Sequence, residues 1–327
     1  MTKTDSTIIR ILTTPLLLAA MVFCAPVFVQ AESTAVTFVV VKNDGLYKKI
    51  INSTEQALIQ TGIEIDKTVI EVNNSRTANA AVNTSSPENL IISIGTKAAA
   101  FAYQQYPDTS MINALITHSS FAQLIHDNFD DTEQALTHQI TPLFIDQPIS
   151  QFFALGLQLV PEAKTIGILI GPSNKSKIPD IKAKAKSLGV TINIALLEPD
   201  SNPIKVIEPI MRSSDFFVVL PDRKHINQLA AKWILPLSYR YRKPVIAYSQ
   251  KYVDAGALAS VFTSPDNVVA TIAEQLQKDV PRAKTGKDEN KHFSISFNRS
   301  VARSLRIEVQ QPEYYQQRLQ AMKVSVP

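Results

Sequence analysis

Short apolar runs alternate with amphipathic stretches along this chain, and this alternation restricts its fold more than any other feature. Residues 37–41 form a run typical of a buried strand, and residues 45–60 follow with apolar side chains at helical spacing. Gly62 then ends the helix, as a glycine at a helix C-terminus does. Residues 63–72 are either a pair of strands or one bent strand. The other elements predicted for this half are strands at 90–94 and 111–117 and a helix at 96–106.

The second half of the chain repeats this order of elements. The segment "IGILIGPSNKSK" corresponds to "FVVVKNDGLYKK" of the first half, and "FFVVLPDRKHIN" corresponds to "LIISIGTKAAAF". A helix at 179–188 has Pro179 near its first turn and ends before Gly189. The other predicted elements are strands at 165–170, 190–196, 215–220 and 244–248 and a long helix from Asp222 towards Tyr241. The two halves therefore form a weak internal repeat.

This repeat predicts an α/β protein with two similar doubly wound parallel-sheet lobes, a hinge and an interlobe cleft. Further strands at 256–262 and 293–297 and helices at 265–278 and 300–305 follow the second half. Residues 141–152 hold two prolines and show no clear period, so the join between the halves falls there. The expected boundaries are lobe 1 at 34–147, joined by about 262–285; lobe 2 at 148–261, joined by about 292–312; and a C-terminal tail at 313–327.

The N-terminus has the pattern of a cleaved secretory signal peptide. Lys3 and Arg10 precede an apolar stretch, and Val29-Gln-Ala31 forms a cleavage site of the A-x-A kind. We expect cleavage between Ala31 and Glu32, so that residues 1–31 are removed. An uncleaved membrane anchor is the alternative, because the apolar stretch is nearly long enough to span a bilayer. The chain is therefore expected in the periplasm.

Cys24 is the single cysteine of the chain, and it lies inside this signal segment. A lipoprotein signal needs a small residue before its cysteine, and Phe23 stands there instead, so lipidation is not expected. After cleavage the mature chain has no cysteine, which excludes disulfides, thiolate catalysis and cysteine metal sites. The fold must then rest on its hydrophobic core, and the mature chain is long enough for one.

The remaining composition points away from nucleic acids and from catalysis. The net charge is +4, but no basic stripe accompanies it, so no nucleic-acid partner is expected. The five histidines are scattered, without a metal-binding spacing, and neither a G-x-S-x-G elbow nor a P-loop occurs. We therefore expect no enzyme activity, no catalytic residues, no cofactor and no metal, and a protein that is a monomer.

Ligands of α/β lobes bind outside the carboxyl ends of the strands, and most of those ends here are small, polar or turn-forming. Gly95 allows a tight turn, and Thr96 and Ser173 are expected to cap the helices that follow them. The free N–H groups at such helix ends can bind a carboxylate or another anion, or the hydroxyls merely cap. The candidate ligand-binding residues are Asn43, Asp44, Gly45, Gly95, Thr96, Lys97, Thr117, His118, Pro172, Ser173, Asn174, Pro221, Asp222, Tyr248 and Ser249.

Some of these candidates have two readings. Lys97 either adds charge to an anion site or points to solvent, and solvent is favoured for a lysine. Tyr47 and Tyr248 either stack on a ligand or belong to the core or rim. His118 is the one histidine at a predicted strand end, and a polar lining role suits it better than a general base. A catalytic histidine needs a carboxylate partner, which the sequence does not place.

Several stretches of the mature chain resemble the ABC-transporter substrate-binding protein family, whose members include tryptophan-binding periplasmic proteins. They are Ile94–Ala99, Leu157–Leu169, Ala183–Val190, Lys243–Val245, Gly256–Ser260 and Ser296–Ile307. The resemblance implies a fold like that of type I periplasmic binding proteins, with the ligand held between two lobes by Gly95-Thr96 and by Pro172-Ser173. The chain has Gly-Pro-Ser where the family often has Asn-Pro-Ser, and Thr117-His118-Ser119 replaces a loop containing Asp-Pro.

The expected function is that of a periplasmic protein that captures a small organic solute, such as an amino acid or another carboxylate, for an ABC importer. The alternative is a stand-alone periplasmic sensor or accessory protein of the same fold, which signals to a membrane partner. An exported α/β enzyme is a third possibility, because a fold does not fix a function.

Overall fold

The structure is a computed structural model, and it describes residues 34–72, 90–128, 140–222, 226, 230–277 and 292–324. The predicted signal peptide, with Cys24, Ala31 and Glu32, lies outside the described residues. Two of the five histidines, His138 and His225, also lie outside them.

The first sheet consists of five parallel strands in the order β2-β1-β3-β4-β5. The run at 63–72 becomes one strand, so the reading of a strand pair is wrong. The strands are β1 (Thr34–Val40), β2 (Ile65–Glu71), β3 (Leu90–Ile94), β4 (Ser110–Ile116) and β5 (Ile140–Phe144). β1 and β3 are buried along most of their length because both faces of a doubly wound sheet are covered by helices.

The second sheet has the order β11-β10-β9-β8-β6-β7, and all of its pairs are parallel except β10 with β11. Read from β7 to β10, this order repeats that of the first sheet from β2 to β5. Its strands are β6 (Thr165–Ile170), β7 (Thr191–Leu196), β8 (Phe216–Val219), β9 (Val245–Ala247), β10 (Ala259–Phe262) and β11 (Ser294–Phe297). The shared order confirms the internal repeat and the prediction of two similar doubly wound sheets.

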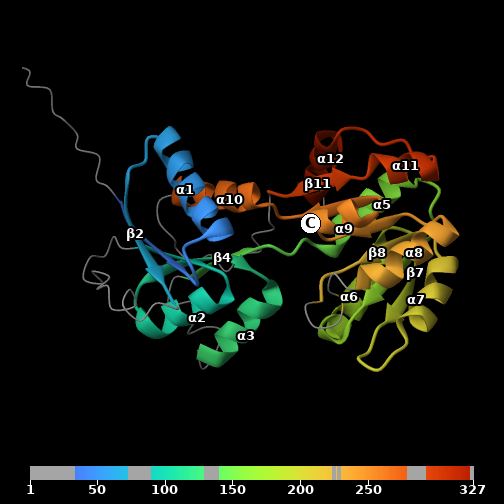
Figure 1. Cartoon of the computed structure of the whole chain (residues 1–327), viewed down its shortest axis with the longest axis horizontal. Helices are drawn as coiled ribbons and strands as arrows, with labels where there is room; N and C mark the ends of the chain where they lie inside the picture. The colour runs from blue at the N-terminus through green and yellow to red at the C-terminus, as the bar shows by residue number, and fades with distance from the viewer. Residues whose placement is uncertain are drawn as a thin grey trace, which may run out of the picture. The chain divides into compact units, whose positions relative to one another are not determined.

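Helices cover both faces of the first sheet. α1 (Gly45–Gln60) and α10 (Pro265–Gln277) lie side by side on one face, and α2 (Thr96–Gln105) and α3 (His118–Asn128) pack on the other (Figure 1). α10 follows β10 of the second sheet in the sequence, yet Val268 and Ile272 are buried against the first sheet. The chain therefore passes between the two sheets more than once.

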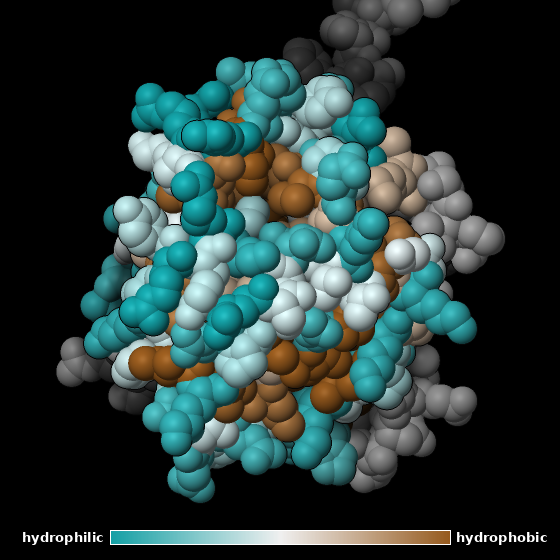
Figure 2. All heavy atoms as spheres, turned by 90° about the vertical axis from the view of Figure 1, so that its right-hand side faces the viewer, coloured by the Kyte–Doolittle hydropathy of each residue, from teal (hydrophilic) through white to brown (hydrophobic). Residues whose placement is uncertain are grey.

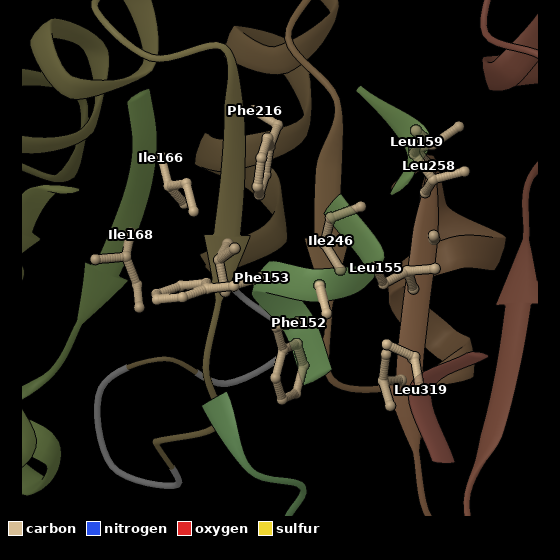
Figure 3. Close-up of a cluster of buried hydrophobic side chains, with 14 of the residues drawn as sticks. Phe152, Phe153, Leu155, Leu159, Ile166, Ile168, Phe216, Ile246, Leu258 and Leu319 are labelled. Carbon is tan, nitrogen blue, oxygen red and sulfur yellow. The ribbon is translucent and has the colours of Figure 1, made fainter. Parts of the chain in front are cut away.

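The second sheet is covered in the same way. Two hydrophobic clusters fill the core of this part of the chain. One cluster receives buried side chains from α5 (Ile149–Leu159), α6 (Ile178–Ser187), α11 (Arg299–Leu305) and α12 (Pro312–Val324). The other receives them from α7 (Pro203–Arg212), α8 (Ala231–Tyr241) and α9 (Gln250–Ala255). In the first cluster, Phe152 and Phe153 of α5 lie among the side chains of β6, β8 and β9 (Figure 3). Large aromatic side chains supply much of the apolar area that such a core buries.

A buried polar network links β3, β4 and α2 inside the first sheet. The Ser93 hydroxyl donates to Oδ1 of Asn113 at 2.6 Å, and the Asn113 amide donates to the Tyr103 hydroxyl. Burial raises the pKa of the Tyr103 hydroxyl, although the hydrogen bond to Asn113 opposes this rise. All three side chains lie in the interior, so each polar group depends on the others for its hydrogen bonds.

Three sequence predictions change in the structure. Residues 140–144 form β5, which overlaps the stretch 141–152 that was predicted as the join between the halves. Pro142 fits in this strand because β5 lies at the sheet edge, where a missing N–H is tolerated. The long helix predicted from Asp222 starts only at Ala231, since Asp222 pairs with Ile226 as a β-bridge. The stretch expected as a tail contains α12, whose Tyr315 and Leu319 are buried in the core of the second sheet.

The surface over the second sheet is largely hydrophilic. Figure 2 shows hydrophobic residues gathered in two areas of this face, with a hydrophilic band between them. The exposed large hydrophobic side chains in this part of the chain come from three helices: Ile204 of α7, Trp233 and Tyr239 of α8, and Tyr314 and Met322 of α12. Within the described ranges, none of the helices has the length and the apolar character that crossing a membrane requires.

Candidate functional site

Each sheet has a topological switch point, where the strand order reverses and the helices after two neighbouring strands lie on opposite faces. In the first sheet this point lies between β1 and β3, and in the second between β6 and β8. Ligands of open α/β sheets bind at such points, outside the carboxyl ends of the strands. The predicted site residues after these four strands therefore lie where the fold favours binding.

At the first switch point, two helices begin without a side-chain cap. Asp44 precedes α1 and Gly95 precedes α2, and neither helix start has a capping hydrogen bond from a side chain. Gly95 has φ of 96°, a value that favours glycine, and its N–H donates to the carbonyl of Ala114 at 2.8 Å. The first N–H groups of both helices, with their positive helix ends, are thus left to a solvent or ligand group.

The prediction that Thr96 caps α2 is wrong. Gly95 occupies the N-cap position, and Thr96 is the first residue of the helix. The reason is the backbone: Gly95 adopts a conformation that β-branched residues avoid, so the turn is completed before Thr96 is reached. Lys97 is exposed, as its solvent reading expects.

Two other candidates at this edge, Asp44 and Asn43, differ in whether their side chains have a partner. The carboxylate of Asp44 pairs with Lys42 at 2.5 Å, and both side chains are mainly exposed. The hydrogen bond to Asp44 and its charge raise the pKa of the Lys42 amine. Oδ1 of Asn43 is buried and has no hydrogen-bond partner, which is unusual for a polar atom in a folded protein. Asn43 therefore keeps an acceptor at the end of β1.

At the second switch point, a carboxylate of the chain itself accepts the hydrogen bonds of the neighbouring strand end. Asp222 follows β8, is 3% exposed, and accepts hydrogen bonds from the Ser173 N–H at 3.1 Å and from the Ser173 hydroxyl at 3.2 Å. Ser173 lies in the short 3-10 helix η1 (Pro172–Lys177), which precedes α6. The prediction that Ser173 caps this helix is wrong, because Gly171 is the N-cap and the Ser173 hydroxyl donates to Asp222 instead.

The other candidates at this edge join the same arrangement. The Asn174 amide donates to the Pro221 carbonyl at 2.9 Å, and Asn174 is buried. The Tyr248 hydroxyl donates to the Ile226 carbonyl at 3.2 Å, and its ring packs against Tyr252 with centroids 5.2 Å apart. Burial, together with the charge of Asp222, raises the pKa of Tyr248. Tyr248 is half-buried and packs against the core of the second sheet. Ser249 precedes α9 without a side-chain capping hydrogen bond.

At the end of β4, α3 is capped from two sides. The Thr117 hydroxyl oxygen accepts the Ser120 N–H at 3.1 Å, and Oδ1 of Asp146 accepts the His118 N–H at 3.0 Å. Nδ1 of His118 also lies 3.0 Å from Oδ2 of Asp146. Sequence reasoning missed Asp146: it follows β5, and without that strand there was no strand end to inspect.

Asp146 carries a charge that its surroundings stabilise. Burial by itself raises the pKa of this carboxyl, but hydrogen bonds from the imidazole and backbone of His118, with the positive charge of the imidazole when protonated, outweigh it and hold the pKa below its usual value. The carboxylate is therefore ionised at neutral pH. It stabilises the folded state above about pH 4, the pKa of an unfolded aspartate, and this contribution is lost as the pH falls through the lowered folded pKa.

A pH series tests this contribution. We expect Asp146→Asn to lower the free energy of unfolding by about 1 kcal/mol at pH 7, because a charged acceptor is replaced by a neutral one and the exposed imidazole is well solvated. The difference between wild type and variant should shrink at pH 3, measured by urea unfolding at both pH values. A difference that stays constant or grows towards pH 3 contradicts the lowered pKa.

The described residues bring together no three His, Cys, Asp or Glu side chains that could hold a metal ion. Three histidines are described: His118, His126 and His292. Two of them contact a carboxylate, since Nε2 of His292 lies 2.9 Å from Oε2 of Glu274.

Two doubly wound sheets of the same strand order, with their switch points at polar strand ends, define the fold of type I periplasmic binding proteins. The sequence matches the family described as ABC transporter substrate binding protein over residues 33–313. The chain belongs to this family, which the resemblance of its motifs had implied. No curated protein matches the sequence.

Solved structures agree with this fold at low sequence identity. An ABC domain from Streptococcus pneumoniae in complex with L-Trp is 22% identical, with a TM-score of 0.50, over 86% of this chain and 98% of that one. A ligand-free, open substrate-binding protein with adhesive properties from Clostridium difficile is 17% identical, with a TM-score of 0.66, over 86% and 97%. A conserved domain protein from Vibrio cholerae is 16% identical, with a TM-score of 0.50, over 86% and 97%.

Proposed function

We propose that the chain is an exported, periplasmic solute-binding protein that captures a small organic carboxylate, such as an amino acid, between its two sheet units for an ABC importer. The observation that carries the ligand class is the pair of uncapped helix starts at the first switch point, α1 and α2. Helix N-termini at a switch point are favourable places for a carboxylate. The protein then releases its ligand chemically unchanged and acts without a cofactor.

The proposal gives the two sheet units different tasks. At the first switch point, the backbone N–H of Thr96 at the start of α2 takes the anionic group, and Asn43 offers an acceptor at the end of β1. At the second, Asp222 already occupies the N–H of Ser173, so an added anion meets a negative charge there. This supports binding of the carboxylate on the first sheet, with the second sheet closing over the rest of the ligand.

Thr96 provides a direct test of the anion site. Proline is tolerated at the first helical position, so Thr96→Pro removes one N–H with little cost to α2. Thr96→Ala keeps that N–H and removes only the hydroxyl. We expect Thr96→Pro to raise the dissociation constant of the amino acid that binds the wild type by about tenfold, and Thr96→Ala to raise it less. Isothermal titration calorimetry measures both constants.

A thermal-shift screen of the mature protein against the common L-amino acids and small carboxylates identifies the ligand. A ligand at about 100 times its dissociation constant stabilises a protein by about 2.7 kcal/mol, which shifts the melting temperature measurably. Equal affinity of a folded Thr96→Pro variant and the wild type removes the start of α2 from the site. No shift with any member of the panel removes the proposed ligand class.

A further inference from the structure

His118 lies against two residues of the segment that leaves the first sheet. Its ring stacks on Phe144 of β5, with centroids 3.6 Å apart and an interplanar angle of 17°. Its Nδ1 lies 3.0 Å from Oδ2 of Asp146, and its backbone N–H donates to Oδ1 of the same carboxylate at 3.0 Å. The imidazole is thus held by a stacking contact and by a hydrogen bond at Nδ1.

The carboxylate determines which nitrogen carries the proton. An ionised carboxylate only accepts hydrogen bonds, so the 3.0 Å contact requires a hydrogen on Nδ1 of His118. In the neutral imidazole, Nε2 then has a free lone pair. The His118 side chain is 59% exposed whereas that of Asp146 is 16% exposed, so the imidazole is accessible to a ligand group outside its contacts with Phe144 and Asp146.

The charges around this pair are few. α2, which packs on α3, carries one charged residue, the exposed Lys97, and α3 itself carries His126 and Asp127 two turns further on. β4 and β5 carry none. Among the residues that the structure describes, Asp146 is the charged group in contact with the imidazole.

We propose that Asp146 is a positioning residue that directs the hydrogen of the neutral form of His118 to Nδ1, so that Nε2 of this form accepts a hydrogen bond from the ammonium group of the ligand. This inference rests on the proposed solute-binding function. It extends that function from a carboxylate to a ligand that carries an ammonium group as well. Lys cannot replace His118 in this role because an ammonium has no acceptor.

The tautomer can be measured without any ligand. In ¹⁵N-labelled protein at pH 8, a long-range ¹H–¹⁵N spectrum of the imidazoles should show His118 with hydrogen on Nδ1, assigned by the loss of its signal in His118→Gln. Asp146→Ala should release this preference. Glu274→Ala is the matched control, since it removes the carboxylate beside His292 and should leave the His118 signal unchanged. Wild-type His118 with hydrogen on Nε2, or a tautomer that persists in Asp146→Ala, overturns the proposal.

The ammonium contact is tested with pairs of probes. Thermal shifts at pH 8 are compared for L-tryptophan, L-phenylalanine and L-leucine and for the same molecules without their amino group. We expect only the amino acids to stabilise the protein, and His118→Leu to weaken the best one by about tenfold. Equal shifts from the deaminated probes, or unchanged binding in His118→Leu, overturn the proposal. If no probe binds and native mass spectrometry finds a bound ligand without an ammonium group, the inference fails while the solute-binding function stands.

Discussion

Gly156→Ala is expected to lower the free energy of unfolding by about 3 kcal/mol, although alanine is the better helix former. Gly156 lies inside α5, where an added Cβ would stand 2.2 Å from Cε2 and 2.4 Å from Cζ of Phe216. Both residues are buried, and Phe216 is one of the side chains of the core cluster of the second sheet (Figure 3). The overlap must push the helix from the sheet, and urea unfolding of wild type and variant measures the cost.

Phe216→Leu serves as the partner in a double-mutant cycle with this change. It shortens the side chain that meets the new methyl group, so the double variant should lose less stability than the sum of the two single losses. A coupling of at least about 1 kcal/mol in that direction is expected. Gly156→Ala with unchanged or higher stability contradicts the packing of α5 on β8.

Asp222→Ala is expected to cost about 3 kcal/mol of stability because it leaves the Ser173 N–H and hydroxyl without their charged acceptor in a buried place. The chain accommodates this carboxylate through Gly171, since a Cβ there would stand 2.3 Å from Oδ2 of Asp222. The inward position of the carboxylate therefore depends on a glycine at residue 171. Thermal or urea unfolding measures the loss.

Gly171→Ala tests the same contact from its other side. Alone it should cost about 1–2 kcal/mol by displacing the carboxylate. In the double variant the new methyl group fills space that the Asp222 side chain leaves, so the two losses should not add. Fully additive losses, or a Gly171→Ala variant as stable as the wild type, contradict the close approach of Asp222 to Gly171.

Periodicity predicts most of this fold, and the failures have physical causes. The bounds of α1, β3 and β6 follow from their apolar spacing and match the sequence prediction. The sequence did not predict β5 because Pro142 interrupts its apolar pattern. The proline is tolerated because β5 lies at the edge of the sheet. The start of α8 was misplaced because Asp222 forms a β-bridge with Ile226. Its carboxylate also binds Ser173, 49 residues away in the sequence, which no local pattern indicates.

For the candidate site, the sequence predicts which residues are involved but not their hydrogen bonds. Strand ends are local features, so Gly95, His118, Ser173 and Asp222 could be selected without a structure. Their hydrogen bonds depend on which strands are neighbours, and this information lies in the sheet order. The capping role of Ser173 was wrong for that reason, and the pairing of His118 with Asp146 could not be seen. The capping role of Thr96 was wrong because Gly95 occupies the N-cap position. Whether these residues bind a ligand stays a prediction.

Native mass spectrometry of the protein, purified without denaturation, tests the proposed solute-binding function most directly. The account predicts a complex of one protein with one small molecule that carries a carboxylate. Unfolding should release this molecule unchanged, and adding it back to the refolded protein should restore the complex. A protein that retains no small molecule and binds none of the common amino acids or small carboxylates, or one that returns its ligand chemically altered, contradicts the account.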